Sequence, residues 1–401
     1  MAGIYIHIPF CNSKCAYCGF YSLPSLKLKD RFLEALKTEI VAREEYFQRE
    51  PHCGLDPQSS ALKANPDMPT INTIYFGGGT PSLLSIKEIG ELLLLINNTY
   101  SVGNNAEITL EANPDTLSLE YLEGLRQLGI NRLSIGIQSF FDNDLKYLSR
   151  LHDAHHAQQC LDWAKLAGFD NISIDLIYGL PSSNAEQWNK NLDIFFAYGL
   201  PHLSAYALTL EPNAILTKQI ELGKVPPINE EDALRDYEIL CMRAIENDYL
   251  HYEISNFCKS EMHSKHNASY WFGVPYIGFG PSAHSFDGAS RQWNVANIEQ
   301  YCNALRHYEE QSNDVKCIQE KERLTPEQHY NEYVMLRLRT HWGIDLKWLK
   351  REMGERFSSY CEKQAQPLIA QGRLSQTREF LYLTDTQMLF ADGVAEELFW
   401  E

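Results

Sequence analysis

The chain lacks the features that carry a protein into or across a membrane. Its longest apolar run is the five residues 92–96, far short of the roughly 20 residues that span a bilayer. The N-terminus has no basic segment followed by a long apolar stretch, so no secretory signal is visible. We therefore expect a cytoplasmic protein without a transmembrane segment.

Positive charge is also scarce. The 35 basic residues are outnumbered by 53 acidic residues, which gives a net charge of −18. This balance keeps a protein soluble and argues against a general nucleic-acid-binding surface. The apolar share of 44% is still enough for a sizeable core.

A second pair of closely spaced cysteines is missing as well. In a reducing cytosol the ten cysteines are expected to be thiols or metal ligands, and only Cys11, Cys15 and Cys18 cluster. This spacing on a short loop lets three thiolates converge on one centre. A [4Fe–4S] cluster held by three cysteines keeps one iron open for a substrate. The alternative is a zinc site with His7 as fourth ligand, although zinc motifs usually contain a second, distant cysteine pair.

Six β-rich runs alternate with amphipathic helical patterns along the first half of the chain. The predicted strands cover residues 4–8, 72–76, 107–111, 132–137, 171–177 and 202–208. Alternating strands and helices require parallel strands joined by right-handed crossovers. The simplest α/β fold is a partial, TIM-like (β/α)6 barrel, in which the chemistry lies at the C-terminal ends of the strands.

Two changes of pattern predict the domain organisation. Residues 48–70 are rich in Pro, Ser and Asn, and we interpret them as a surface insertion. The βα rhythm stops near residue 290, and residues 324–400 have a helical pattern with a short β-like run near the end. We therefore predict a barrel domain over 1–290 and a small, mainly helical domain over 291–401. Its first helix carries a stripe of Tyr333 and Leu336, with His329 one turn earlier.

Polar side chains interrupt several of the predicted apolar strands at or near their ends. Glu111, Gln138 and Asp175 belong to strands three, four and five. A buried carboxylate needs a partner to offset its desolvation, and a cationic ligand would supply one. Internal salt bridges to Arg132 or Arg150 are the alternative.

The segment His266-Asn267-Ala-Ser-Tyr270-Trp271 combines a histidine with flat aromatic side chains. Histidine is a common axial ligand of heme iron, and aromatic rings offer apolar surface to a porphyrin. His263 and Cys258 lie nearby in the sequence and are rival ligands. The later His284 is equally suited to lining a pocket and to capping a turn.

The run from Tyr5 through the three cysteines resembles the radical S-adenosylmethionine (SAM) superfamily. It is similar to the branch that contains oxygen-independent coproporphyrinogen III oxidase and the radical SAM heme chaperones. The resemblance implies that Cys11, Cys15 and Cys18 hold a [4Fe–4S] cluster and that SAM chelates the open iron. It also implies a set of SAM contacts, which comprises Tyr5, Tyr17, Gly78, Gly79, Thr80, Glu111, Gln138, Arg150, Asp175 and Ala207.

Three features favour the chaperones within this branch. The oxidase pattern has a further cysteine two residues after the third ligand, where this chain has Phe20. Only ten residues precede Cys11, whereas the oxidases have a substantial segment there. The third feature is that His266, Asn267, Tyr270 and Trp271 match the H-N-x-x-Y-W motif of the heme chaperones.

The resemblance therefore implies a protein that binds heme and transfers it to apo-haemoproteins. Its expected partners are heme, apo-haemoprotein clients, a reductant for the cluster and a second copy of the chain in a homodimer, with no nucleic acid. Transient membrane association fits clients that reside at the membrane. The alternative is an oxygen-independent coproporphyrinogen III oxidase, and a third is a chain whose cluster has become a purely structural metal. The sequence leaves open whether SAM cleavage is part of the role.

Overall fold

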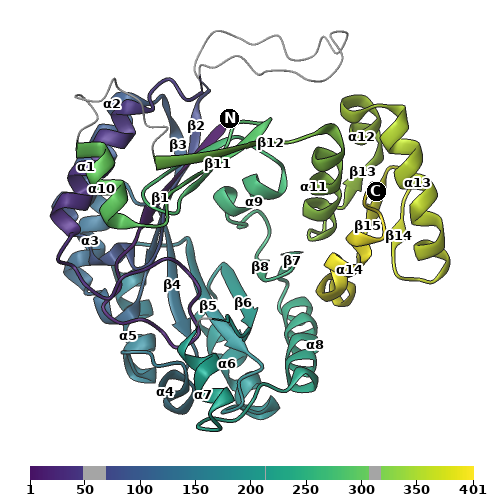
Figure 1. Cartoon of the computed structure of the whole chain (residues 1–401). Coiled ribbons are helices and arrows are strands. Elements are labelled where there is room, and N and C mark those ends of the chain that lie inside the picture. The colour runs from purple at the N-terminus through teal and green to yellow at the C-terminus, as the bar shows by residue number, and fades with distance from the viewer. Residues whose placement is uncertain (48–68, 213, 307–317) are drawn as a thin grey trace.

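Six parallel strands form the centre of the molecule, in the order in which they follow each other along the chain (Figure 1). The computed structural model describes residues 1–47, 69–212, 214–306 and 318–401. The strands are β1 (Ala2–Ile8), β2 (Ile71–Gly78), β3 (Val102–Ala112), β4 (Arg132–Gln138), β5 (Ile172–Tyr178) and β6 (His202–Ala207). Each pairs in parallel with the next, which confirms the predicted partial barrel.

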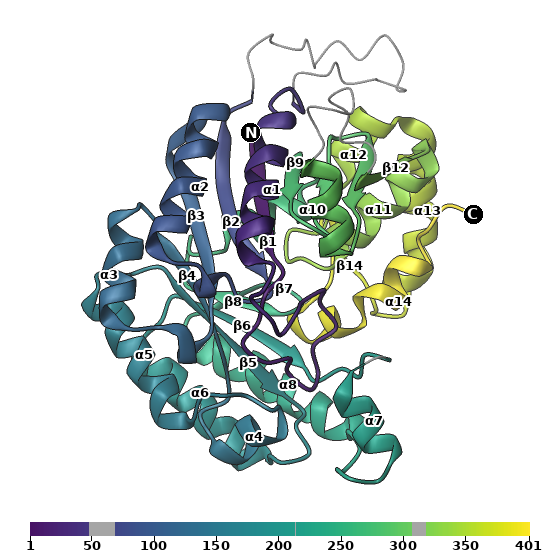
Figure 2. The ribbon, with the colours of Figure 1, turned by 60° about the vertical axis from the view of Figure 1, so that its left-hand side comes forward.

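Helices cover the outer face of this curved sheet, as Figure 2 shows. They are α1 (Lys29–Ala42), α2 (Ile86–Thr99), α3 (Leu119–Gln127), α4 (Asp142–Tyr147), α5 (Ala154–Leu166) and α6 (Ala185–Tyr198). A capping box begins α2, because the backbone N–H of Ser85 donates to Glu88 and the N–H of Glu88 donates to Ser85 Oγ. Between β4 and β5 the chain forms two helices, α4 and α5, where a simple alternation of strands and helices has one.

The sheet continues beyond the six predicted strands on both sides. The antiparallel strands β8 (Asn256–Cys258) and β7 (Leu250–Glu253) follow β6. On the other side β9 (Tyr276–Phe279) pairs in parallel with β1, followed by β10 (His284–Phe286), β11 (Ser290–Asn294) and β12 (Gln319–Arg323). The helices of this region are α7 (Ile215–Glu221), α8 (Glu230–Glu246), α9 (Lys265–Trp271) and α10 (Ile298–Arg306).

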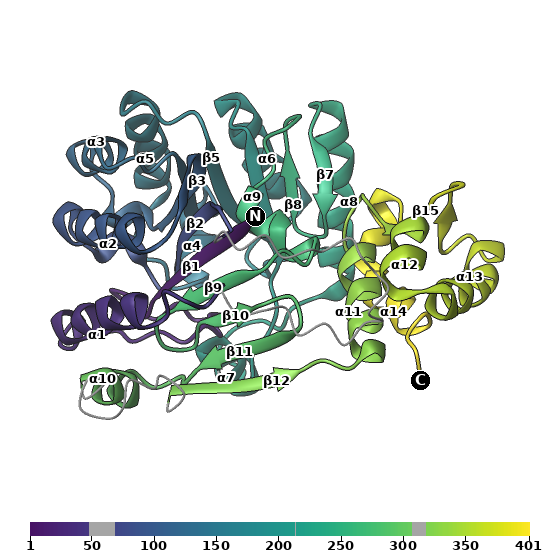
Figure 3. The ribbon, with the colours of Figure 1, turned by 90° about the horizontal axis from the view of Figure 1, so that it is seen from above.

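The last part of the chain has a hydrophobic core of its own. It contains α11 (Pro326–Leu338), α12 (Leu346–Met353), α13 (Glu355–Ala370), α14 (Ala391–Glu396) and a small sheet of β13 (Ile344–Asp345), β14 (Ser375–Gln376) and β15 (Phe380–Tyr382). Figure 3 shows it on the opposite side of the large sheet from α1, α2 and α3.

The large sheet extends past residue 290, where the sequence analysis placed the domain boundary. The segments β11, α10 and β12 belong to the large sheet and its helices, so we place the boundary near Leu324. Of the predicted insertion 48–70, residues 48–68 lie outside the described residues. Among the described residues, none of the helices combines the length and the apolar character needed to cross a membrane.

One buried carboxylate holds the added strands to the barrel. Glu39 on α1 is fully buried and accepts four hydrogen bonds. They come from Arg43 at 3.0 Å, Asn294 Nδ2 at 2.8 Å, the Gly280 N–H at 2.8 Å and the Tyr301 hydroxyl at 2.7 Å. This carboxylate therefore joins α1 to β11, α10 and the turn after β9.

Replacing Glu39 with alanine is expected to lower the free energy of unfolding by about 3–5 kcal/mol, because it leaves the buried Arg43 guanidinium without a counter-ion. The matched control is Glu186→Ala on α6. It breaks an exposed ion pair between Glu186 and Lys190, whose charged atoms lie 2.7 Å apart. This control is expected to leave the free energy of unfolding nearly unchanged, because both partners of the pair are exposed to solvent. Chemical denaturation of both variants measures the difference, and equal effects would contradict the assigned role of Glu39.

Candidate functional site

The three clustered cysteines lie on a loop that leaves the C-terminal end of β1. Backbone hydrogen bonds close this loop at its base, from Leu23 N–H to Pro9 O at 2.8 Å and from Cys11 N–H to Leu23 O at 3.0 Å. Its tip is held by the fully buried Ala16, whose carbonyl accepts from the Leu216 N–H at 2.8 Å. The loop is thus anchored at both ends, while the three thiols remain partly exposed.

The thiols face a cavity of about 570 Å³ at the C-terminal ends of the strands. The structure brings to this cavity all three cysteines and nine of the ten residues predicted to contact SAM. These nine are Tyr17, Gly78, Gly79, Thr80, Glu111, Gln138, Arg150, Asp175 and Ala207. Tyr5 does not line the cavity. Its ring stacks on that of Tyr75, with 6.1 Å between the ring centroids.

Two polar side chains contact the thiols directly. Thr80 donates its hydroxyl to Cys11 Sγ at 3.5 Å. Arg150 donates from Nη1 to Cys15 Sγ at 3.3 Å, and its other amino group is held by Asn113 Oδ1 at 2.6 Å. A guanidinium in this place stabilises an anionic sulfur such as a metal-bound thiolate.

The predicted fourth ligand of a zinc site is not available. His7, the predicted alternative ligand, has both ring nitrogens engaged, since Nε2 donates to Tyr21 O at 2.9 Å and Nδ1 lies 3.1 Å from the Tyr5 hydroxyl. Within the described ranges, no three cysteine, histidine or acidic side chains converge closely enough to hold one ion. Three cysteines spread along a cavity wall match the donor set of a [4Fe–4S] cluster with one open iron.

The lining of the cavity also contains two half-buried carboxyl groups. Glu111 accepts from the Tyr75 hydroxyl at 2.8 Å and from the Gly78 N–H at 3.1 Å, yet burial raises its pKa to about 7. Burial likewise raises the pKa of Asp175 to about 6. Neither forms the predicted ion pair with Arg132 or Arg150 within 4 Å. The cavity therefore offers negative charge to a cationic ligand, which fits the sulfonium and ammonium groups of SAM.

Asn113 is a contact residue that the sequence analysis missed. It follows Glu111 by two residues, donates to Thr80 Oγ1 at 3.0 Å and accepts from Arg150. It therefore links the two side chains that touch the thiols. An asparagine before proline at the end of a predicted strand was the available signal.

The predicted heme motif is divided between two surroundings. His266 points into the barrel, is 1% exposed and has both ring nitrogens hydrogen-bonded, to Thr73 Oγ1 at 2.8 Å and to the Tyr270 hydroxyl at 2.7 Å. Burial, with the charge of Arg132, lowers its pKa to about 3. Tyr270 and Trp271 instead line a second cavity. The side chain of Asn267 forms no hydrogen bond with the described residues, and only its backbone N–H donates, to Ser264.

This second cavity has a volume of about 400 Å³ and lies where α9 and the β9–β10 strands meet α11 and α12. His284 lines it, which decides between the two predicted roles of that residue. The two rival heme ligands do not line this cavity. Cys258 is buried in β8, and the ring of His263 packs against that of Tyr252.

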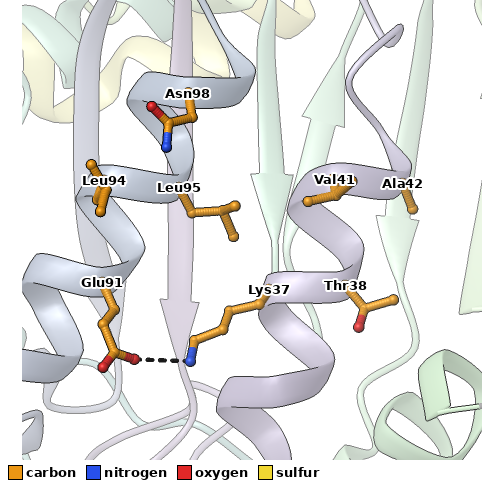
Figure 4. Close-up of a pocket in the computed structure, with 8 residues that line it drawn as sticks. All are labelled: Lys37, Thr38, Val41, Ala42, Glu91, Leu94, Leu95 and Asn98. Carbon is orange, nitrogen blue, oxygen red and sulfur yellow. Dashed lines mark hydrogen bonds and ion pairs between the residues drawn. The ribbon is translucent and has the colours of Figure 1, made fainter.

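A surface groove between α1 and α2 offers no comparable chemistry (Figure 4). Its two charged side chains form an ion pair, in which Lys37 Nζ lies 2.9 Å from a carboxylate oxygen of Glu91. The rest of its lining is mainly aliphatic, including Val41, Leu94 and Leu95. None of the described lining residues is a cysteine or a histidine.

Substituting Gly79 with alanine is expected to disturb the cysteine loop. A Cβ at this position would lie 2.5 Å from the carbonyl oxygen of Phe10 and 2.8 Å from that of Ile8. We expect a loss of about 1–3 kcal/mol of stability and less iron and sulfide bound per chain after anaerobic reconstitution. Gly393→Ala in α14 is the control, since nothing lies within 4 Å of its Cβ and alanine favours helices. Unchanged cluster content in Gly79→Ala would contradict the assigned contact.

The comparisons with known proteins agree with this geometry. Residues 5–194 match the radical SAM superfamily, and residues 324–390 match the HemN C-terminal domain. The fold is similar to that of coproporphyrinogen III oxidase (HemN) from Escherichia coli, with a TM-score of 0.80 and 22% identity over 99% of this chain and 89% of that chain.

Curated relatives extend over nearly the whole chain. The heme chaperone HemW of Bacillus subtilis is 30% identical over 98% of both chains, and that of Mycobacterium tuberculosis (strain CDC 1551 / Oshkosh) is 30% identical over 99% of this chain and 94% of its own. Heme chaperone HemW of Escherichia coli (strain K12) is 36% identical over 70% of this chain and 69% of its own. From the full-length similarity and the three-cysteine cavity together, the chain belongs to the HemW family within the radical SAM superfamily.

Proposed function

We propose that this protein is a radical SAM heme chaperone, which binds heme and passes it to apo-haemoproteins while carrying a SAM-ligated [4Fe–4S] cluster. The observation that carries the proposal is the presence of two separate cavities. One is lined by three thiols and two half-buried carboxyl groups, and the other is aromatic and includes Tyr270 and Trp271 of the expected heme motif. Relatives that match over the whole chain are named heme chaperones.

In the first cavity, Cys11, Cys15 and Cys18 would hold three of the four irons. When bound and reduced, such a cluster would supply one electron for the reductive cleavage of SAM. The chain's own part is to bind and orient SAM. The loop Gly78, Gly79 and Thr80 would take its methionine end. The other predicted contacts that line the cavity would surround the rest, namely Tyr17, Glu111, Gln138, Arg150, Asp175 and Ala207. Tyr5 does not line the cavity and is left out of this set.

The proposed partners follow from this role. Heme is the cargo, an apo-haemoprotein is the client, and a reductant serves the cluster. We place the protein in the cytoplasm, with transient contact to membranes where clients reside there, and we include a homodimer among its assembly states. The acidic net charge of −18 leaves nucleic acid out of the proposal.

An oxygen-independent coproporphyrinogen III oxidase is the second candidate, favoured by the similarity of the fold to HemN. Against it stands position 20, where the expected additional cysteine is replaced by Phe20. This side chain is 70% exposed and belongs to the lining of the cysteine cavity. A phenyl ring cannot supply a thiol to either cofactor or substrate.

A transfer assay tests the proposed function. The anaerobically reconstituted chain is expected to bind heme and, after mixing, to pass it to apo-myoglobin, as followed by the Soret band of the acceptor. A parallel anaerobic assay with reductant, SAM and coproporphyrinogen III is expected to yield no protoporphyrinogen. Formation of protoporphyrinogen would instead establish the oxidase.

The affinity for SAM is expected to fall as the pH is lowered from 8 to 6. In the free protein Glu111 and Asp175 take up protons with pKa values of about 7 and about 6, and a cationic ligand must displace these protons. Each group contributes up to about a tenfold loss per pH unit below its pKa. Equilibrium dialysis measures the affinity, with Glu111→Gln as the control. This variant should bind more weakly at pH 8 and show a flatter pH profile; a flat profile in the unchanged protein would refute the charge-based account.

A further inference from the structure

The second cavity has the composition of a site for a planar metal complex. Its volume of about 400 Å³ falls in the usual range of small-molecule pockets. Tyr270 and Trp271 contribute to one wall, and Tyr333 and Trp348 contribute to the opposite wall, where their rings stack at 4.3 Å. Extended aromatic walls of this kind favour a flat apolar ligand.

Two histidines in this cavity have free ring nitrogens. His284 comes from β10 on the side of the large sheet, and His329 comes from α11 on the side of the C-terminal domain. Across the described residues, neither imidazole forms a hydrogen bond with another protein group. Both are accessible, since His284 is exposed and His329 is half-buried. Imidazoles in this state can coordinate iron, whereas both nitrogens of His266 are already occupied.

Helix α11 presents one face to the core of the C-terminal domain and a second face to this cavity. Tyr330, Val334 and Leu338 enter the core of the C-terminal domain. His329, Tyr333 and Leu336 repeat at the spacing of a second helical face and line the cavity, with Glu332 between them. The stripe noted in the sequence therefore forms part of the cavity wall, and its Tyr333 also packs against the core of the C-terminal domain.

Polar groups at the same cavity suit a ligand with carboxylates. Arg291 on β11 lines it and forms an ion pair with Glu332, which connects the two walls. The indole N–H of Trp271 is buried and has no hydrogen-bond partner in the described chain. A buried donor without a partner is costly, and a ligand carboxylate would satisfy it.

We propose that this cavity is the heme site, where His284 and His329, rather than His266, would supply the imidazole ligands of the iron. The inference deepens the proposed chaperone function and rests on it. His266 is then a positioning residue: its hydrogen bond to the Tyr270 hydroxyl holds that ring in the wall, while the imidazole stacks on Tyr75 inside the barrel at 5.0 Å.

Titration of the full-length reconstituted chain with ferric heme tests this site, with Soret difference spectra and electron paramagnetic resonance as readouts. The unchanged protein should show low-spin, imidazole-ligated iron. His284→Ala and His329→Ala should each shift the iron toward high spin, and the double variant should bind heme at least tenfold more weakly. His155→Ala is the matched control, since this histidine is exposed on α5 in the outer helical layer; it should leave the spectrum unchanged.

His266 variants separate positioning from ligation. His266→Ala should weaken heme binding but retain the low-spin signal, and His266→Gln, which can still bond to Tyr270, should recover most of the affinity. The site assignment is overturned if the double variant keeps the spectrum and affinity of the unchanged protein, or if His266→Ala alone removes the low-spin signal. Absence of any heme binding by the unchanged protein would overturn the chaperone function together with it, so the two failures are distinguishable.

Discussion

The close approach of two backbone segments beyond the ends of β1 and β2 sets the geometry of the cysteine cavity. Strand pairing continues past the strands, because Gly79 N–H donates to Ile8 O at 2.8 Å and Thr80 N–H donates to Phe10 O at 2.7 Å. There is no room for a side chain at Gly79. The cysteine loop and the glycine loop are therefore parts of one hydrogen-bonded unit, and Thr80 reaches Cys11 because of it.

The parts of this architecture that could be predicted from sequence are those that repeat or cluster. Alternating strands and helices revealed the six parallel strands, and parallel strands bring Glu111 and Asp175 to one cavity. The short strands were not predictable in the same way. β12, with the sequence QEKER, has no apolar alternation and is a strand because β11 lies beside it.

The directions in which side chains point from a short helix could not be predicted from the sequence either. The motif in α9 has His266 and Trp271 five residues apart, and the spacing alone did not reveal that one faces the barrel and the other a cavity. That division depends on Thr73, a residue of β2 nearly 200 positions earlier. His284 posed the same problem, since its role depends on α11 and α12 of the other domain.

The position of β1 has a consequence for how the chain acquires its structure during synthesis. β1 pairs with β2 on one edge and with β9 on the other. All residues of the cysteine cavity up to Glu211 have been made long before Tyr276–Phe279 leaves the ribosome. Until then the second edge of β1 is an unpaired template for other strands. A chain interrupted in that interval would carry the cysteines beside an open sheet edge, which favours aggregation over orderly loading with iron.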